Sequence, residues 1–258
     1  MRQGARARIA QMAADRTSIA GNIERARERI TRAAERAGRR GEDVTLIAIS
    51  KTFPARAIRQ AFEAGARHFG ENRVQEWEGK HGELQDLRAI WHLVGHLQSN
   101  KTKRAAGLFH SIDSVDSVEL ARKLDAAFAA EPVNSSAAKS SDHSRRLNVL
   151  VEVRLSPEES KAGVEEAELE ALAEALQAMP HLELRGLMTI PPFLDDPEQV
   201  RPFFRKLREL RDSLSLRIGR SLPELSMGMS HDYETAVEEG ATQVRLGTSI
   251  FGDRAKIV

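Results

Sequence analysis

The sequence has 258 residues but no cysteine, a single tyrosine and two tryptophans. Without cysteine, the chain cannot form disulfides, use a thiolate nucleophile or build a zinc site from thiolates. This composition fits a reducing compartment, and we expect a cytoplasmic protein. The sequence also has no apolar run of about 18 residues, the length that a transmembrane helix needs, so we expect no membrane partner.

Charge of one sign is not in excess either. Lys and Arg total 39 and Asp and Glu total 38, which leaves a formal net charge of +1. That balance offers no electrostatic footprint for nucleic acid, and we expect no nucleic-acid partner. The first 16 residues are arginine-rich and lack the apolar core of a secretory signal, so 1–16 is predicted to be a flexible arm.

What the sequence does contain is a regular alternation of short apolar runs and amphipathic stretches. An amphipathic helix is predicted over 18–37, and further helical patterns follow at 55–64, 118–129, 165–179 and 197–216. Strands are predicted at 44–49, 67–70, 90–95, 108–112, 147–153, 183–188, 224–228 and 243–247.

Strands that alternate with helices indicate a parallel sheet, because parallel strands need crossover connections. With eight such units and 41% hydrophobic residues, we predict an α/β fold: a single (β/α)8 TIM barrel with an extra N-terminal helix. An open doubly wound sheet is the alternative. The barrel is expected to form one domain over 17–258, with the serine-rich stretch 131–146 as a surface loop. We expect a monomer or a weak dimer.

Functional side chains of such barrels gather where the strands end. The first strand runs into "LIAISKTFP", which places Lys51 directly after a buried strand. The last two strands run into "SMGMS" (226–230) and "RLGTS" (245–249), whose glycines and hydroxyls suit an oxyanion. The histidines at 68, 92, 96 and 110 show no spacing typical of a metal site, so we expect hydrogen-bonding roles and no metal.

A lysine opposite a phosphate site indicates a phosphorylated carbonyl compound, because a lysine of lowered pKa forms imines with aldehydes. Pyridoxal 5′-phosphate and the sugar phosphate of a class I aldolase both remain open at this point. If the ligand is pyridoxal phosphate, an arginine such as Arg245 facing the ring nitrogen would keep that nitrogen unprotonated.

Eight sequence blocks fall in order along the chain: "ISKTFPARAI", "HFGENRVQE", "WHLVGHLQSNK", "SIDSVDS", "SKAGV", "LRGLMTIPP", "LSMGMSHDYETAV" and "VRLGTSIFG". Together they resemble the pyridoxal phosphate homeostasis protein family, single-domain proteins similar to the N-terminal barrel of alanine racemase. The blocks span residues from about 44 to 254, so the resemblance covers most of the chain.

The resemblance implies a cofactor and the residues that hold it. Lys51 matches the lysine that holds pyridoxal phosphate as an internal aldimine, and Arg245 matches the arginine near the pyridine nitrogen. Lys161 matches a second lysine proposed to act in cofactor transfer. The remaining matches are phosphate contacts at Ser226, Gly247 and Thr248, with Ser230 beside them, and cofactor neighbours at Asn72, Met188 and His92.

The same resemblance favours a binding protein over an enzyme. Racemisation needs a proton acceptor on each face of the carbanion, and alanine racemase resemblance implies a tyrosine from a second domain as one of them. We expect no second domain here, and the single tyrosine is Tyr233. The expected role is intracellular homeostasis of pyridoxal phosphate, held on Lys51 and supplied to apo-enzymes. A low-efficiency amino-acid racemase is the alternative, and a class I aldolase is a remoter one.

Overall fold

The computed structural model describes residues 18–131, 146–156 and 162–252. The predicted arm at 1–16, nearly all of the predicted loop at 131–146 and Lys161 therefore lie outside the described residues. The division into an arm and one domain stays a prediction.

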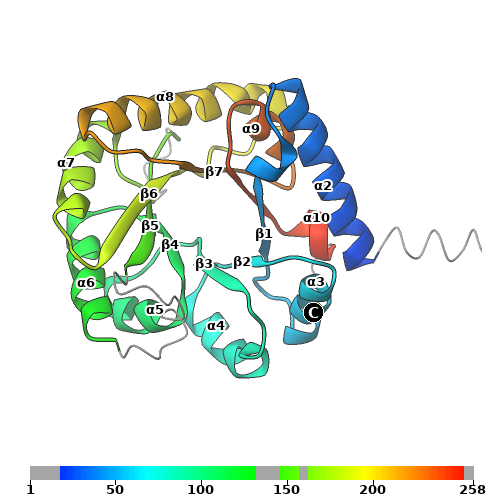
Figure 1. Cartoon of the computed structure of the whole chain (residues 1–258), viewed down its shortest axis with the longest axis horizontal. Coiled ribbons are helices and arrows are strands. Elements are labelled where there is room, and N and C mark those ends of the chain that lie inside the picture. The colour runs from blue at the N-terminus through cyan, green and yellow to red at the C-terminus, as the bar shows by residue number, and fades with distance from the viewer. Residues whose placement is uncertain (1–17, 132–145, 157–161, 253–258) are drawn as a thin grey trace, which may run out of the picture.

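Eight parallel strands close into a barrel in which each strand pairs with its neighbours in chain order and β1 pairs with β8 (Figure 1). This confirms the predicted (β/α)8 barrel and excludes the open sheet. The strands are β1 (Thr45–Ile49), β2 (His68–Glu71), β3 (Ile90–Leu93), β4 (Ser111–Val115), β5 (Leu147–Glu152), β6 (Leu182–Met188), β7 (Glu224–Met229) and β8 (Gln243–Leu246).

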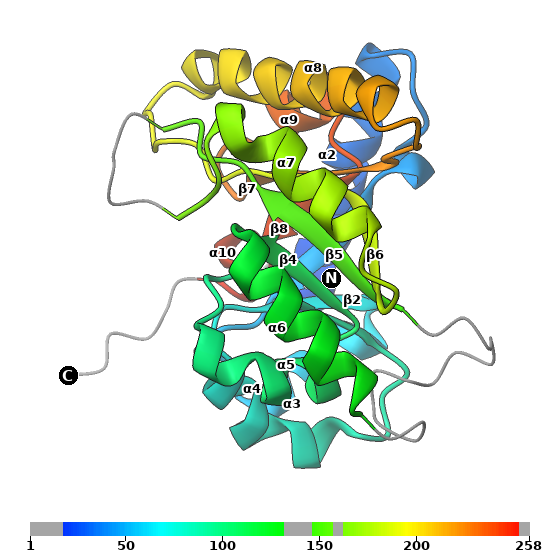
Figure 2. The same cartoon turned by 90° about the vertical axis from the view of Figure 1, so that its left-hand side faces the viewer.

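Helices surround the barrel (Figure 2). They are α2 (Ile19–Arg36), α3 (Ala55–Glu63), α4 (Val74–His81), α5 (Thr102–Leu108), α6 (Val118–Ala129), α7 (Glu166–Gln177), α8 (Arg201–Arg217), α9 (Tyr233–Glu238) and α10 (Thr248–Phe251). None of these described helices is both long enough and apolar enough to cross a membrane.

The predicted extra N-terminal helix is α2, which lies outside the barrel against α9 and α10 (Figure 1). Ser18 caps it, because the serine hydroxyl accepts a hydrogen bond from the backbone N–H of Gly21 at 3.1 Å. One face buries Ile23, Ala26 and Ile30, which matches the apolar spacing of the sequence. Burial of this apolar face therefore holds α2 against α9 and α10.

The main hydrophobic core lies between the strands and the helix layer, whereas the inside of the barrel is largely polar. Ile47, Ile49 and Val94 form a small apolar cluster of their own inside the barrel. Below the barrel mouth, inward positions are taken by polar side chains that are almost fully buried, namely His92, Asp113, Glu152, Ser226 and Arg245. Such groups cost free energy to bury unless they are hydrogen-bonded or paired, which points to a specific use for this interior.

Two tryptophans join α4 to the barrel. The ring of Trp77 on α4 stacks on that of Trp91 on β3, with centroids 3.6 Å apart and planes inclined by 27°. Both side chains are buried, and the indole N–H of Trp77 donates to the carbonyl of Leu108 at 3.3 Å. The pair fixes α4 against the strands that carry the second and third βα turns.

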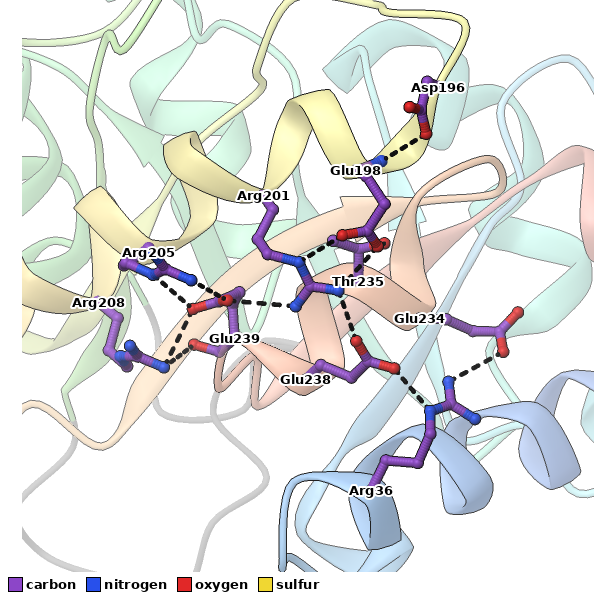
Figure 3. Close-up of polar contacts among 10 residues, drawn as sticks. All are labelled: Arg36, Asp196, Glu198, Arg201, Arg205, Arg208, Glu234, Thr235, Glu238 and Glu239. Atoms are coloured by element: carbon purple, nitrogen blue, oxygen red, sulfur yellow. Dashed lines mark hydrogen bonds and ion pairs between the residues drawn. The ribbon is translucent and has the colours of Figure 1, made fainter.

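An arginine–glutamate network ties α8, α9 and α2 together (Figure 3). At its centre, Arg201 of α8 donates to Glu198 at 2.7 Å and to Glu238 of α9 at 2.6 Å. Glu238 also accepts from Arg36 of α2 at 2.7 Å. Burial alone would raise the pKa of Glu238, but the hydrogen bonds from Arg201 and Arg36 outweigh it and lower the pKa.

Replacing Arg201 by methionine should lower the free energy of unfolding by about 2 kcal/mol at pH 7, because carboxylates on α9 lose their central partner in a half-buried site. A carboxylate whose folded pKa is lowered stabilises the protein above its unfolded pKa of about 4.3 and loses that effect as the pH falls through its folded pKa. The deficit of R201M should therefore shrink below pH about 4. Urea titrations at several pH values measure this. Arg104→Met, which removes an exposed ion pair to Glu78, should cost under about 1 kcal/mol.

Candidate functional site

The turn after β1 carries Lys51 to the carboxyl end of the barrel. Ser50 continues the strand, with its N–H donating to the carbonyl of Gly70 at 2.9 Å. Pro54 then precedes α3, so Lys51 lies in a five-residue connection, 50–54, between a buried strand and a helix. Alternation along the strand puts Lys51 on the same side as Ile47 and Ile49, which is the inside of the barrel.

A cavity of about 390 Å³ opens at this end of the barrel. Its volume lies in the range of small-molecule sites. The sequence-predicted residues that line it are Lys51, Asn72, Ser230, Arg245, Gly247 and Thr248. They come from the ends of β1, β2, β7 and β8, so the structure brings the predicted lysine and the two predicted phosphate turns into one cavity.

Backbone donors of the β8 turn converge on one hydroxyl. The N–H groups of Gly247 and Ser249 both donate to Oγ of Ser230, each at 3.2 Å. Two N–H groups that point at one oxygen form the kind of concave donor set that binds oxyanions. Packing within the protein does not require a glycine at position 247, since a Cβ built there would lie 3.7 Å from Ile49, at ordinary contact distance. A phosphate oxygen could therefore take the place of the Ser230 hydroxyl among these donors.

Arg245 forms the inner wall of the cavity and is almost fully buried. Its guanidinium donates to Oγ of Ser226 and to the carbonyl of Thr189, both at 2.8 Å. Burial lowers the pKa of Arg245, and the nearby carboxylates of Asp113 and Glu152 oppose that shift. An arginine remains protonated in such a site, so the cavity has a fixed positive charge at its base.

Ser226 and Met188 do not line the cavity. Both side chains are fully buried in the layer beneath it, and the hydroxyl of Ser226 serves Arg245. The assignment of Ser226 as a phosphate contact thus has no support from its position, while a role in orienting Arg245 follows directly. Glu152 pairs with Met188 across β5 and β6, and burial raises the pKa of Glu152 to about 7 against the lowering effect of Arg245.

The predicted interior histidine lies deeper. His92 hydrogen-bonds through Nδ1 to Asp113 at 3.0 Å and through Nε2 to Nδ1 of His68 at 3.0 Å. Burial lowers the pKa of His68 to about 4, with the neighbouring His92 adding to the shift. His68 is therefore neutral at pH 7. These contacts give His92 the hydrogen-bonding role expected from the sequence.

Some cavity residues were missed by sequence reasoning. Asp232 lines the cavity and accepts the N–H of Met229 at 2.6 Å, which closes the turn after β7. Burial raises the pKa of Asp232. At the rim, the exposed ring of Phe193 lies against His231, with centroids 5.1 Å apart, and Ile190 lies close by. The blocks "SMGMSHD" and "TIPPF" hold these residues at the ends of β7 and β6, and that position was the available signal.

A larger hollow of about 830 Å³ runs along α2, outside the barrel. Its walls are mostly helix-surface residues such as Arg27, Glu28 and Arg32. No strand end reaches it, and its volume reflects a broad groove between exposed side chains. The smaller cavity at the barrel mouth is therefore the candidate site.

Comparison with known proteins identifies relatives. A family model described as the N-terminal domain of alanine racemase matches residues 21–255. A curated "Pyridoxal phosphate homeostasis protein" of Aquifex aeolicus is 46% identical over 233 residues, covering 90% of this chain and 96% of that protein. The structure of PipY from Synechococcus elongatus PCC7942 with PLP bound is 38% identical with a TM-score of 0.77, covering 91% of this chain and 100% of that one.

A more distant likeness extends to alanine racemase from Corynebacterium glutamicum, with a TM-score of 0.60 and 19% identity over 90% of this chain and 59% of that one. That likeness concerns the fold. The match of the family model over most of the chain, together with relatives above 30% identity over nearly their full length, confirms the resemblance drawn from the sequence blocks. The chain belongs to the family of pyridoxal phosphate homeostasis proteins, built on the barrel of the alanine racemase N-terminal domain.

Proposed function

We propose that this chain binds pyridoxal 5′-phosphate and acts in its homeostasis, with Lys51 as the amine that holds the cofactor. The aldehyde carbon and Nζ of Lys51 would join as an imine, with release of one water molecule. The observation that carries the proposal is the single cavity in which Lys51, the converging N–H groups of Gly247 and Ser249, and the buried Arg245 meet. PLP is also what the relative from Synechococcus elongatus has bound.

The residues present fit each part of the cofactor. The N–H groups of the β8 turn, with Thr248 and Ser230, would hold the phosphate, and Asn72 would lie near the ring. Arg245 would face the pyridine nitrogen, where its fixed positive charge disfavours protonation of that nitrogen. Ser226 supports this role by holding the guanidinium in place.

Two features favour storage over catalysis. An unprotonated ring nitrogen makes the cofactor a weaker electron sink, which slows carbanion chemistry. The one tyrosine of the sequence, Tyr233, is buried under α2, with the guanidinium of Arg29 5.2 Å from its ring centroid. Burial raises the pKa of Tyr233, and the residue does not line the cavity. It is thus poorly placed to act as a second base.

Storage on a lysine is reversible, because an imine exchanges with another amine or hydrolyses. We therefore propose that recipient apo-enzymes accept the cofactor from this protein, in the cytoplasm, with no nucleic-acid or membrane partner. A monomer or a weak dimer suffices, since all the proposed contacts come from one chain. Whether Lys161 takes part in transfer remains a prediction.

Incubation with pyridoxal 5′-phosphate followed by gel filtration tests the proposal. We expect a protein-bound absorbance band of an imine near the visible edge, which borohydride reduction fixes as a covalent mass increase on one peptide. A colourless protein would contradict it. The loaded protein should show no appreciable turnover with a panel of L-amino acids, because Tyr233, the tyrosine that would act as the second base, does not line the cavity. Turnover of many per second would instead establish the racemase alternative.

A further inference from the structure

The turn that carries Lys51 is held from behind by α4. Strand alternation sends Lys51 and Asn72 toward the cavity and sends Ser50 and Glu71 to the opposite side, toward the helix layer. Ser50 and Glu71 are fully buried there, and the serine hydroxyl donates to Oε1 of Glu71 at 2.7 Å. A buried carboxylate thus lies directly behind the proposed cofactor lysine.

Lys80 of α4 provides the counter-ion for that carboxylate. Its ammonium donates to Oε1 of Glu71 at 2.9 Å, to the carbonyl of Ser50 at 3.0 Å and to Oε1 of Glu76 at 3.2 Å. An ammonium has three N–H donors, so these contacts use all of them. Oε2 of Glu71 has no hydrogen-bond partner in the part of the chain that the structure describes, and burial raises the pKa of Glu71. The buried Glu71 carboxylate thus relies on Lys80 for its compensating positive charge.

Glu76, one helical turn before Lys80, reaches the other side of the same turn. Its carboxylate accepts the backbone N–H of Thr52. Thr52 has a φ of 69°, and it is the only non-glycine residue at positive φ among those described. This left-handed conformation is unfavourable for a β-branched residue and persists only where the surroundings enforce it.

The two contacts bracket Lys51. Lys80 holds the carbonyl of the peptide that precedes Lys51, and Glu76 holds the N–H of the peptide that follows it. With both peptide planes fixed, the Cα–Cβ direction of Lys51 is fixed as well, since only φ and ψ separate the planes. The i,i+4 spacing of Glu76 and Lys80 places both groups on one face of α4.

We propose that Glu76 and Lys80 are positioning residues that hold the strained Lys51–Thr52 turn so that Nζ of Lys51 points into the cavity. This inference rests on the proposed imine at Lys51. Glu76 acts through the Thr52 N–H and needs only an acceptor oxygen, and its negative charge is not required for that contact.

A Lys80 variant is a poor test, because it leaves Glu71 buried without a counter-ion and threatens folding. Glu76 is the better choice, since Lys80 then keeps Ser50 and Glu71. Glu76→Gln is the matched control, because its amide oxygen can still accept the N–H. In the double variant Thr52→Gly/Glu76→Ala, glycine adopts positive φ without strain and removes the need for the contact.

We expect E76A to form the imine with about tenfold lower affinity, since releasing a left-handed β-branched residue favours other turn conformations by about that factor. E76Q should stay within about twofold of the unaltered protein, and T52G/E76A should recover to within about threefold. Absorbance titration of the imine band gives these values. Equal affinity of E76A and the unaltered protein would overturn the proposal, as would loss in E76Q equal to that in E76A.

Hydrogen exchange of the cofactor-free protein separates this inference from the proposed function. The Thr52 amide should exchange slowly in the unaltered protein and in E76Q, and much faster in E76A. If the unaltered protein forms no imine but shows this exchange pattern, the proposed function fails, while the role of Glu76 in holding the Lys51–Thr52 turn is supported. If the imine forms but the Thr52 amide exchanges equally fast in all three proteins, Glu76 does not hold the turn and this inference is wrong.

Discussion

Replacing Lys51 by methionine should abolish the imine band and weaken retention of pyridoxal 5′-phosphate by about a hundredfold or more, because only non-covalent contacts remain. The fold should persist, since Lys51 lies in a connection at the cavity and methionine fills a similar volume. Absorbance titration, together with borohydride reduction and peptide mass mapping, measures the loss. Residual weak binding should still depend on the phosphate.

Lys51→Arg is the matched control for this variant. It keeps a positive charge at the cavity but cannot form an imine at neutral pH, because the guanidinium stays protonated. Both variants should therefore lose the imine band, while the Lys51→Arg variant keeps more of the electrostatic attraction for phosphate. A K51M protein with a full-strength band would assign the imine to another lysine, and Lys161→Met would then be the variant to compare.

Replacing Gly247 by alanine should weaken binding of pyridoxal 5′-phosphate by about 10- to 100-fold, the value of one or more charge-assisted hydrogen bonds. A Cβ there meets only Ile49 at ordinary distance, and the φ of Gly247 is −105°, in the negative range that other residues adopt. Unfolding free energy should thus change by under about 1 kcal/mol. The methyl group would, however, extend into the cavity beside the converging N–H donors.

Gly228 provides the contrast on the neighbouring strand. Its φ is +91°, and a Cβ there would lie 2.5 Å from Cβ of Ala236 and 2.9 Å from Cα of Tyr233. Gly228→Ala should therefore destabilise the fold by about 2–4 kcal/mol whatever it does to binding.

Titration with pyridoxal, which lacks the phosphate, is the ligand control for Gly247→Ala. An equal loss for both ligands would show that Gly247 does not contact the phosphate.

Most of the barrel could be predicted from the sequence because its signals are local. Buried parallel strands show up as continuous apolar runs, and the amphipathic pattern at 118–129 coincides with α6 (Val118–Ala129). The strand predicted at 108–112 was displaced, since β4 is Ser111–Val115 and residue 108 ends α5. Its inward positions are Ser111 and Asp113, so the polar barrel interior removed the apolar signal there.

The site divides in the same way. Lys51, Gly247 and Thr248 could be placed because the carboxyl ends of parallel strands meet at one edge. The depth of a residue in the barrel could not be read from the sequence, and only the structure shows that Ser226 is buried against Arg245 while its role as a phosphate contact stays a prediction. Contacts between a helix and a distant turn leave no local pattern either. Glu76 and Lys80 show an ordinary i,i+4 spacing on a helix, and only the fold brings them to Lys51.

The stacked tryptophans of α4 and β3 give the molecule a built-in optical label. Trp77 and Trp91 are the two tryptophans of the sequence, and at 3.6 Å their indole transitions must couple. Circular dichroism in the region of the strong far-ultraviolet indole transition should therefore show a paired band of opposite signs that disappears when α4 leaves the barrel. Because Trp77 follows Glu76 directly in the chain, the spectrum reports on the helix behind Lys51 without any added dye. Loading, unloading and variants of that helix can thus be followed in the unmodified protein.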